Sequence, residues 1–256
     1  MKKLIRITAV ALMLGFLFTL HPILLQGDYA PEEVEPGSRW PYAPRPEIRT
    51  RSDWGALPHM ETLNSGEFMR DPEQTIRIVF HHTAGNNSVT DCLHYIAGRI
   101  RNIQYGHMNP RGAPTSGTGW SDIGYHFIIC QLGYIWEGRD MQFTGAHLSG
   151  FNHNIGIAVL GNFAPRYTLG NQPANELTEP QIEAMIAMSK WLIYTYDMEY
   201  IPPTRRPGFP SYREGNAAAP ITTHRSIGRS ACPGANAGQF IENDLRALIN
   251  EWGRSS

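Results

Sequence analysis

The sequence contains little cysteine, little net charge and only one long hydrophobic run. Its three cysteines confine thiol chemistry to Cys92, Cys130 and Cys232. The formal net charge is −1, so nothing in the charge balance indicates binding to nucleic acid or to an anionic membrane surface. Nineteen prolines and 25 glycines indicate a loop-rich protein rather than a helical bundle. The length of 256 residues fits one domain with a sizeable core, with or without appendages.

The one long hydrophobic run lies at the N-terminus. A basic stretch, Met1 to Arg6, precedes the mostly apolar segment Ile7 to Leu25. We therefore predict that residues 1–26 form a secretory signal peptide, with an uncleaved membrane anchor or an ordinary helix as the alternatives. No cysteine follows the run, which disfavours a lipid-modified N-terminus. Residues 27–47 hold five prolines and no periodicity, as expected of an extended tether before a domain at 48–256.

Two neighbouring histidines end a run of β-branched and aromatic residues. The run at 76–80 is typical of a buried strand, and His81 and His82 follow it directly. Adjacent strand side chains point to opposite faces, so only one of these histidines can enter a given site. Far downstream, His224 and Cys232 lie eight residues apart. Two imidazoles and one thiolate are a plausible Zn²⁺ ligand set that leaves a fourth position open for water, which suggests a zinc hydrolase.

Hydrophobic periodicity predicts a single α/β domain. Apolar residues at spacings of three and four after Ser88 predict an amphipathic helix, and a capping-box pattern at Thr178 to Gln181 begins a second helix that ends near Tyr196. A C-terminal helix is predicted with one apolar face made of Phe240, Ile241, Leu245, Leu248, Ile249 and Trp252. Further strands are predicted at 124–130, 134–138 and 155–160. Strands interleaved with helices indicate a central mixed β-sheet flanked by helices.

Several separated motifs occur together in an order that matches a known family. They are His81-His82-Thr83-Ala84-Gly85, Gly119 to Phe127, Glu137-Gly138-Arg139, Gly145-Ala146-His147, Ser149 to Ile157, Gly161-Asn162-Phe163, His224-Arg225 and Cys232-Pro233-Gly234. From Arg51 to Trp252 the chain resembles the zinc-dependent N-acetylmuramoyl-L-alanine amidases of the peptidoglycan recognition protein and bacteriophage lysozyme-amidase superfamily. The resemblance implies the amidase fold of that superfamily and cleavage of the lactyl amide between N-acetylmuramic acid and L-alanine.

The resemblance also implies roles for individual residues in catalysis. The metal ligands fall on His81, His224 and Cys232, with one Zn²⁺ per chain. Tyr125 matches the catalytic tyrosine, which would orient the attacking water and donate to the developing oxyanion; the alternative is a strand aromatic packed in the core. Ser230 stands where the phage enzyme has lysine and many recognition proteins have threonine, so it is either a hydrogen-bond donor to the tetrahedral intermediate or a simple loop serine.

Substrate contacts follow from the same resemblance. Gly119, Trp120 and Arg139 match a pattern associated with diaminopimelate-type stem peptides, whose extra carboxylate a guanidinium can hold in a bidentate pair. His147 and Asn152 are expected to line the same groove. The alternatives are a surface or turn arginine and two loop-stabilising residues. The loops 109–118 and 202–220 are longer than in the family and form either walls of the groove or mere insertions.

Two other functions compete with a zinc amidase. A peptidoglycan-binding receptor without turnover would not need His81, His224, Cys232 and Tyr125 together, and non-catalytic members typically lose the first histidine or the cysteine. A structural zinc domain would usually have four protein ligands, and no fourth is evident. Cys92 and Cys130 are predicted either to form a disulfide or to remain buried free thiols. The expected partner is peptidoglycan or a muropeptide outside the cytoplasm, periplasmic or secreted, with a membrane involved only if residues 1–26 stay attached.

Overall fold

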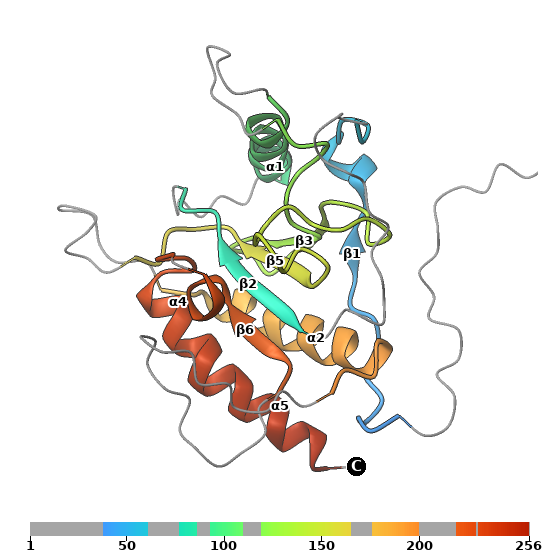
Figure 1. The fold of residues 1–256 in the computed structure, drawn as a ribbon, viewed down its shortest axis with the longest axis vertical. Helices are drawn as coiled ribbons and strands as arrows, with labels where there is room; N and C mark the ends of the chain where they lie inside the picture. The colour runs from blue at the N-terminus through green and yellow to red at the C-terminus, as the bar shows by residue number, and fades with distance from the viewer. Residues whose placement is uncertain are drawn as a thin grey trace, which may run out of the picture. The chain divides into compact units, whose positions relative to one another are not determined.

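A six-stranded mixed β-sheet lies at the centre of the fold, in the order β1-β4-β3-β5-β2-β6 (Figure 1). The computed structural model describes residues 38–60, 77–85, 93–109, 119–164, 176–199, 219–228 and 230–255, which all fall within the unit Val34–Ser256. The strands are β1 Ile48–Arg49, β2 Ile78–His82, β3 Phe127–Ile129, β4 Ile135–Glu137, β5 Ile155–Val159 and β6 Ile221–Thr223. β3 and β4 pair antiparallel and the other neighbours pair parallel, which confirms the predicted mixed sheet.

Helices cover both faces of this sheet. One face packs against α2 (Glu179–Thr195), the π-helical segment η4 (Phe240–Leu245) and α5 (Arg246–Gly253). The other face packs against α1 (Leu93–Met108) and the short 3₁₀ helix η1 (Arg51–Trp54), and Figure 1 shows α1 and α2 on opposite sides. Two shorter helices, α3 (His224–Ile227) and α4 (Ala235–Gln239), follow β6. This alternation of faces is what period-two strand patterns predict.

The strand β2 places its two histidines on opposite faces, as predicted. Ile78 and Phe80 belong to the core beside α2 and α5, whereas Val79 does not. His82 continues the first set, and its ring lies beside Phe163 of the same core, with centroids 6.4 Å apart. His81 therefore projects to the other face of the sheet, where its side chain is only 1% exposed.

The predicted start of α2 is confirmed in atomic detail. The Thr178 hydroxyl accepts a hydrogen bond from the Gln181 backbone N–H at 3.3 Å. In return, the Gln181 side-chain oxygen accepts from the Thr178 N–H at 3.1 Å. This reciprocal capping box satisfies two backbone donors that the first helical turn otherwise leaves unpaired.

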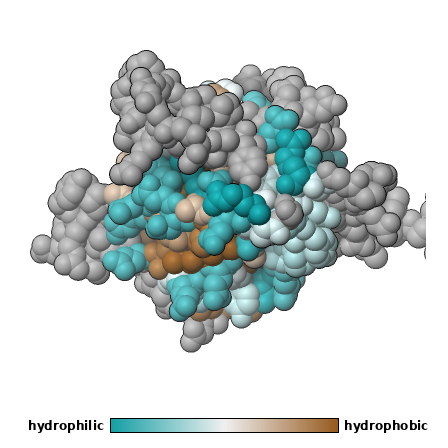
Figure 2. Space-filling model, turned by 90° about the horizontal axis from the view of Figure 1, so that it is seen from below, coloured by the Kyte–Doolittle hydropathy of each residue, from teal (hydrophilic) through white to brown (hydrophobic). Residues whose placement is uncertain are grey.

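The C-terminal helix differs from its prediction at one position. Ile241, Leu245 and Ile249 are fully buried, but Leu248 is 42% exposed. A residue one step before Ile249 is turned by about 100° around the helix axis, which carries it toward solvent. Seen from below the view of Figure 1, the surface of the domain carries a limited apolar strip framed by hydrophilic side chains (Figure 2).

The predicted tether before residue 48 is wrong for residues 38–47. Trp40 is 2% exposed, donates from its indole Nε1 to the Met198 carbonyl at 2.6 Å, and stacks on Trp252 with ring centroids 5.5 Å apart. The domain therefore begins before residue 48. The proline content of this segment does not reveal that the Trp40 side chain is buried in the core.

The described residues test only some of the other predictions for the N-terminus and the cysteines. The signal or anchor segment 1–26, residues 27–37 and most of the loops 109–118 and 202–220 lie outside them. Within the described ranges, no helix combines the length and apolarity needed to cross a membrane. Cys130 is a buried free thiol, and Cys92 lies outside the described residues.

Gly156 in the central strand β5 offers a direct test of packing. A Cβ added there would lie 2.5 Å from Cδ2 of His147. We expect Gly156→Ala to lower the free energy of unfolding by about 1–3 kcal/mol through overpacking. Gly98, on α1, has no atom within 4 Å of an added Cβ; Gly98→Ala should raise the stability by about 0.5–1 kcal/mol through helix propensity. Urea unfolding of the wild type and of both variants measures these changes. A Gly156→Ala variant as stable as the wild type would show that His147 moves aside freely.

Candidate metal centre

The parallel pair β2–β6 brings the three predicted metal ligands together. Phe80 is in register with Thr223, so His81 and His224 each follow a paired residue at the same edge of the sheet. Cys232 comes from the loop after α3, where its carbonyl accepts a hydrogen bond from the Arg225 N–H at 2.8 Å. Ligand atoms of His81, His224 and Cys232 all lie within 4.8 Å of one another. The chain segments that the sequence separates by more than a hundred residues thus form one cluster.

The cluster has the donor set of a zinc site, and the distance between Cys232 and His81 is close to that expected around zinc. The Cys232 Sγ lies 3.7 Å from His81 Nδ1. Tetrahedral zinc with Zn–N of about 2.0 Å and Zn–S of about 2.3 Å separates nitrogen from sulfur by roughly 3.5 Å. Two imidazoles and a thiolate are soft-to-borderline donors that suit Zn²⁺ better than Mg²⁺ or Ca²⁺. The residues present therefore fit a zinc ion with three protein ligands.

A second imidazole, that of His147, fixes the orientation of His81. His147 Nδ1 lies 3.0 Å from His81 Nε2, and its Nε2 lies 3.1 Å from the Asn154 carbonyl oxygen. A carbonyl only accepts, so His147 Nε2 carries the hydrogen; burial lowers the pKa of His147 to about 4 and keeps the ring neutral. His147 Nδ1 then accepts from His81 Nε2–H, which leaves the His81 Nδ1 lone pair facing Cys232. An outer partner of this kind is what zinc-binding histidines usually have.

The thiol of Cys232 is half-buried beside a backbone donor. Burial raises the pKa of the Cys232 thiol to about 12, although the hydrogen bond from the His82 N–H to Sγ acts in the opposite direction. A thiol of this kind keeps its proton until a cation displaces it, so metal binding here releases a proton. The Ser230 hydroxyl accepts from the Cys232 N–H at 3.1 Å. Ser230 thus lies next to the cluster, with its oxygen engaged in shaping the Cys232 loop.

Tyr125 lies at the edge of the metal cluster, just before β3. Its ring centroid is 5.2 Å from that of His81 and 5.6 Å from that of His107. Burial first, and then the nearby Cys232, raise the pKa of the Tyr125 phenol above its ordinary value. The phenol therefore stays protonated over the physiological range and can donate a hydrogen bond.

His107 was missed by the sequence analysis. It lies in the last turn of α1, where its Nδ1 accepts from the Gly124 N–H at 3.0 Å and its ring lies 4.8 Å from that of Trp120. Burial, followed by the positive charge of Arg139, lowers the pKa of His107 to about 4. The Trp120 N–H donates to the His107 carbonyl at 2.9 Å, so one residue ties α1 to the segment that leads to Tyr125. Its spacing on α1 alone gave no sign of this role.

Three of the predicted substrate contacts, His147, Arg139 and Asn152, have their polar groups engaged within the protein. Arg139 is 4% exposed and donates to the carbonyls of Ile123 at 2.8 Å, Thr144 at 2.9 Å and Asp122 at 3.1 Å. The Asn152 side-chain oxygen accepts from the backbone N–H groups of His147 and Leu148. Gly119 and Trp120 are half-buried, and Gly119 adopts a φ of 71° that favours glycine. Substrate contact by any of these residues stays a prediction.

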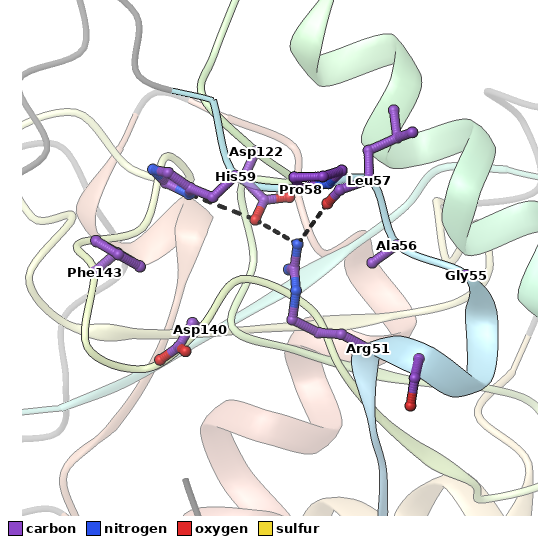
Figure 3. A pocket seen from close by; sticks show the side chains of 10 residues that line it. Arg51, Gly55, Ala56, Leu57, Pro58, His59, Asp122, Asp140 and Phe143 are labelled. Carbon is purple, nitrogen blue, oxygen red and sulfur yellow. Dashed lines mark hydrogen bonds and ion pairs between the residues drawn. The ribbon is translucent and has the colours of Figure 1, made fainter. Parts of the chain in front are cut away.

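A separate cavity of about 280 Å³ beside η1 contains none of the three ligands. Figure 3 shows Arg51 reaching Asp122 and the Leu57 carbonyl from one side of it, each at 2.9 Å. His59 and Phe143 both line the cavity and stack on each other, with ring centroids 4.4 Å apart. Asp122 is 1% exposed, so this ion pair fastens η1 to the segment that leads into Tyr125.

Glu242 of η4 was also missed, and its carboxylate lies behind the turn that carries His224. Burial alone would raise the pKa of Glu242, but hydrogen bonds from Arg225, Ser226 and Thr223 lower it overall. A carboxylate with a lowered pKa stabilises the fold above its unfolded pKa, and this contribution is lost as pH falls through the folded value.

This direction predicts how Glu242→Gln changes acid stability. We expect the variant to be less stable than wild type by about 1.5–3 kcal/mol at pH 7, because charged hydrogen bonds are lost. The difference should shrink below about pH 4.3, where the unfolded carboxyl takes up its proton. Denaturant unfolding of both proteins between pH 3 and 7 measures it. A difference that stayed constant over this range would contradict a charged Glu242.

Comparison with known proteins agrees with this geometry. A family model described as N-acetylmuramoyl-L-alanine amidase matches residues 71–235. Peptidoglycan-recognition protein SC2 of Drosophila simulans is 29% identical over 209 residues, which cover 79% of this chain and 86% of that protein.

Solved structures share the fold at lower identity. N-acetylmuramoyl-L-alanine amidase LysC from Clostridium intestinale aligns with a TM-score of 0.51 and 24% identity, covering 80% of this chain and 98% of its own. The complex of peptidoglycan recognition proteins LCa and LCx with bound tracheal cytotoxin aligns with a TM-score of 0.54 and 23% identity, covering 78% and 96%. These alignments show a shared fold.

Proposed function

Because the chain belongs to the N-acetylmuramoyl-L-alanine amidase family, we propose that it is a zinc hydrolase that cleaves the lactyl amide between N-acetylmuramic acid and L-alanine of peptidoglycan or muropeptides. The observation that carries the proposal is the cluster of His81, His224 and Cys232 with Tyr125 beside it. A protein that only binds a stem peptide needs neither a catalytic metal nor a phenol next to it.

The residues of the cluster divide the chemistry between them. His81, His224 and Cys232 would hold Zn²⁺, which supplies Lewis acidity that polarises the scissile carbonyl and makes a water molecule acidic enough to attack it. His147 holds His81 in the tautomer that presents Nδ1. The protonated Tyr125 phenol donates a hydrogen bond to the oxygen on which negative charge develops. Ser230 is proposed as a second, weaker donor from the Cys232 loop.

We place the reaction outside the cytoplasm. The basic and apolar composition of residues 1–26 supports export to the periplasm or the medium. Peptidoglycan is found there, and the solved relative that carries tracheal cytotoxin supports a peptidoglycan fragment as the partner. Residues 1–26 are proposed as a cleaved signal, with a retained anchor as the alternative.

Hydrolysis of defined diaminopimelate muropeptides tests the function. The zinc-loaded protein and the chelated protein are incubated with substrate, and products are identified by mass spectrometry. We expect release of the intact stem peptide from the loaded protein only. Tight binding without cleavage would support a receptor instead, a function that the similarity to a peptidoglycan-recognition protein leaves as the rival. Cleavage that survives chelation would overturn the zinc role.

Arg139 is proposed to favour diaminopimelate-type over lysine-type stem peptides. Arg139→Ala should lower kcat/KM on diaminopimelate muropeptides by about 10–100-fold more than on lysine ones, which is the worth of a charged hydrogen bond. The guanidinium also holds three backbone carbonyls, so the variant will lose stability. The ratio of the two activities cancels that loss because both come from the same protein. Equal losses on the two substrates would leave Arg139 a purely internal residue.

A further inference from the structure

The Glu242 carboxylate bonds to residues on both sides of His224 without touching His224 itself. Its Oε1 accepts from the hydroxyls of Thr223 and Ser226, each at 2.6 Å. Arg225 donates from Nε to Oε1 at 3.2 Å and from a terminal nitrogen to Oε2 at 2.9 Å. The short helix α3 begins at His224. The Glu242 carboxylate therefore binds the N-cap residue Thr223 and two residues of the single turn of α3, Arg225 and Ser226.

The same turn is connected to the third ligand. Thr223 caps α3 by accepting from the Ser226 N–H at 3.3 Å, and its side chain is fully buried. The N–H of Arg225 donates to the carbonyl of Cys232 at 2.8 Å. A shift of the α3 turn would therefore move His224 directly and the Cys232 loop through its backbone.

A second side chain of the same helical region fixes the strand that leads into this turn. Arg246 lies one turn after Glu242, is 5% exposed, and donates from Nε to the Ile221 carbonyl at 2.8 Å. Ile221 and Thr223 are the two ends of β6. Glu242 and Arg246 thus hold both ends of the strand that delivers His224. Glu242 itself lies in a π-helical segment, a conformation that recurs near functional sites.

We infer that Glu242 is a positioning residue for the metal centre, which sets the place of His224 and Cys232 through the α3 turn. The inference rests on the proposed zinc function. A carboxylate that merely stabilised the surface would need one ion pair with solvent access. Glu242 instead has a side chain only 18% exposed and accepts hydrogen bonds from three residues of the same turn, Thr223, Arg225 and Ser226. Residues that orient metal ligands in this way typically change metal affinity by about 10–100-fold when altered.

The test compares Glu242→Ala and Glu242→Gln with a matched carboxylate elsewhere. Asp197 accepts from Ser38 at 3.2 Å and from the Arg39 side chain at 3.1 Å, and contacts no predicted ligand. Asp197→Asn removes one charge with little change of shape, as Glu242→Gln does. Zinc dissociation constants come from competition with a chromophoric chelator. The absorption spectrum of the Co²⁺-substituted protein reports ligand geometry independently of activity.

We expect Glu242→Ala to weaken zinc binding by about 10–100-fold and to change the Co²⁺ spectrum. Glu242→Gln, which keeps one oxygen acceptor, should weaken it less, and Asp197→Asn should leave it unchanged. If Glu242→Ala fails to fold, Glu242→Gln decides the matter. Wild-type zinc affinity and Co²⁺ spectrum in a folded Glu242 variant, even one of lower thermal stability, would overturn the positioning role. Absence of zinc binding by the wild type would instead overturn the proposed function.

Discussion

Cys232→Ser is expected to lower kcat/KM for muropeptide hydrolysis by at least about a thousandfold, which corresponds to roughly 4 kcal/mol of transition-state stabilisation. The thiolate is one of three protein ligands, and a serine hydroxyl does not replace it as a donor to zinc. Sγ also accepts a hydrogen bond from the His82 N–H at 3.3 Å, and a serine oxygen can accept the same bond. The substitution should therefore change the loop little while it removes the metal ligand. Product release followed by mass spectrometry, with zinc content measured on the same sample, gives the result.

Cys130→Ala is the matched control for this experiment. Cys130 is a free thiol buried in the core beside α1, and it is not part of the ligand cluster. We expect this variant to keep stoichiometric zinc and near wild-type activity, with a modest loss of stability. Retention of both zinc and activity by Cys232→Ser would show that the cluster of His81, His224 and Cys232 is not the catalytic centre.

Tyr125→Phe is expected to lower kcat by about 100–1,000-fold, which is the usual loss when one oxyanion donor is removed. Phenylalanine keeps the ring that packs 5.2 Å from His81 and loses only the hydroxyl. Zinc content and thermal stability should therefore remain close to wild type, and KM should change little. Steady-state kinetics on a defined muropeptide separate the two constants.

Tyr134→Phe provides the comparison for the hydroxyl loss. Tyr134 lies in the turn between β3 and β4, is 40% exposed, and has the Arg49 guanidinium over its ring at 4.6 Å. The cation–π contact needs only the ring, so this variant should behave as wild type. A Tyr125→Phe enzyme as active as Tyr134→Phe would exclude the phenol from the chemistry.

The sequence was sufficient for the parts of the fold that have a strong local pattern. The face alternation of β2, the capping box at Thr178 and the burial of Ile96 and Ile100 on α1 follow from spacing and residue type. The trio of His81, His224 and Cys232 followed from ligand chemistry and family motifs, and the structure brings it together. These features depend on a few residues that are close in the chain or chemically distinctive.

What the sequence could not give depends on contacts between distant segments. The strand β6 is only three residues long, which is too short for a periodic pattern, although it delivers His224. Glu242 looks like any acidic residue on a helix until Thr223 and Ser226 fold against it. Arg139 looks like a surface cation, yet its donors are used by three carbonyls. Each case is decided by long-range packing, which propensity does not contain.

The stack of Trp40 on Trp252 joins the two ends of the domain. The two rings lie 5.5 Å apart, one near the beginning of the described chain and the other near its end. Proteolytic maturation that removes residues up to about position 37 leaves this aromatic stack intact. Cleavage beyond Trp40 would remove a buried aromatic side chain from the core and expose the last helix. The same closeness of the ends makes the domain a good candidate for circular permutation, with Arg254 joined to Ser38 through a short linker and new ends opened in a surface loop.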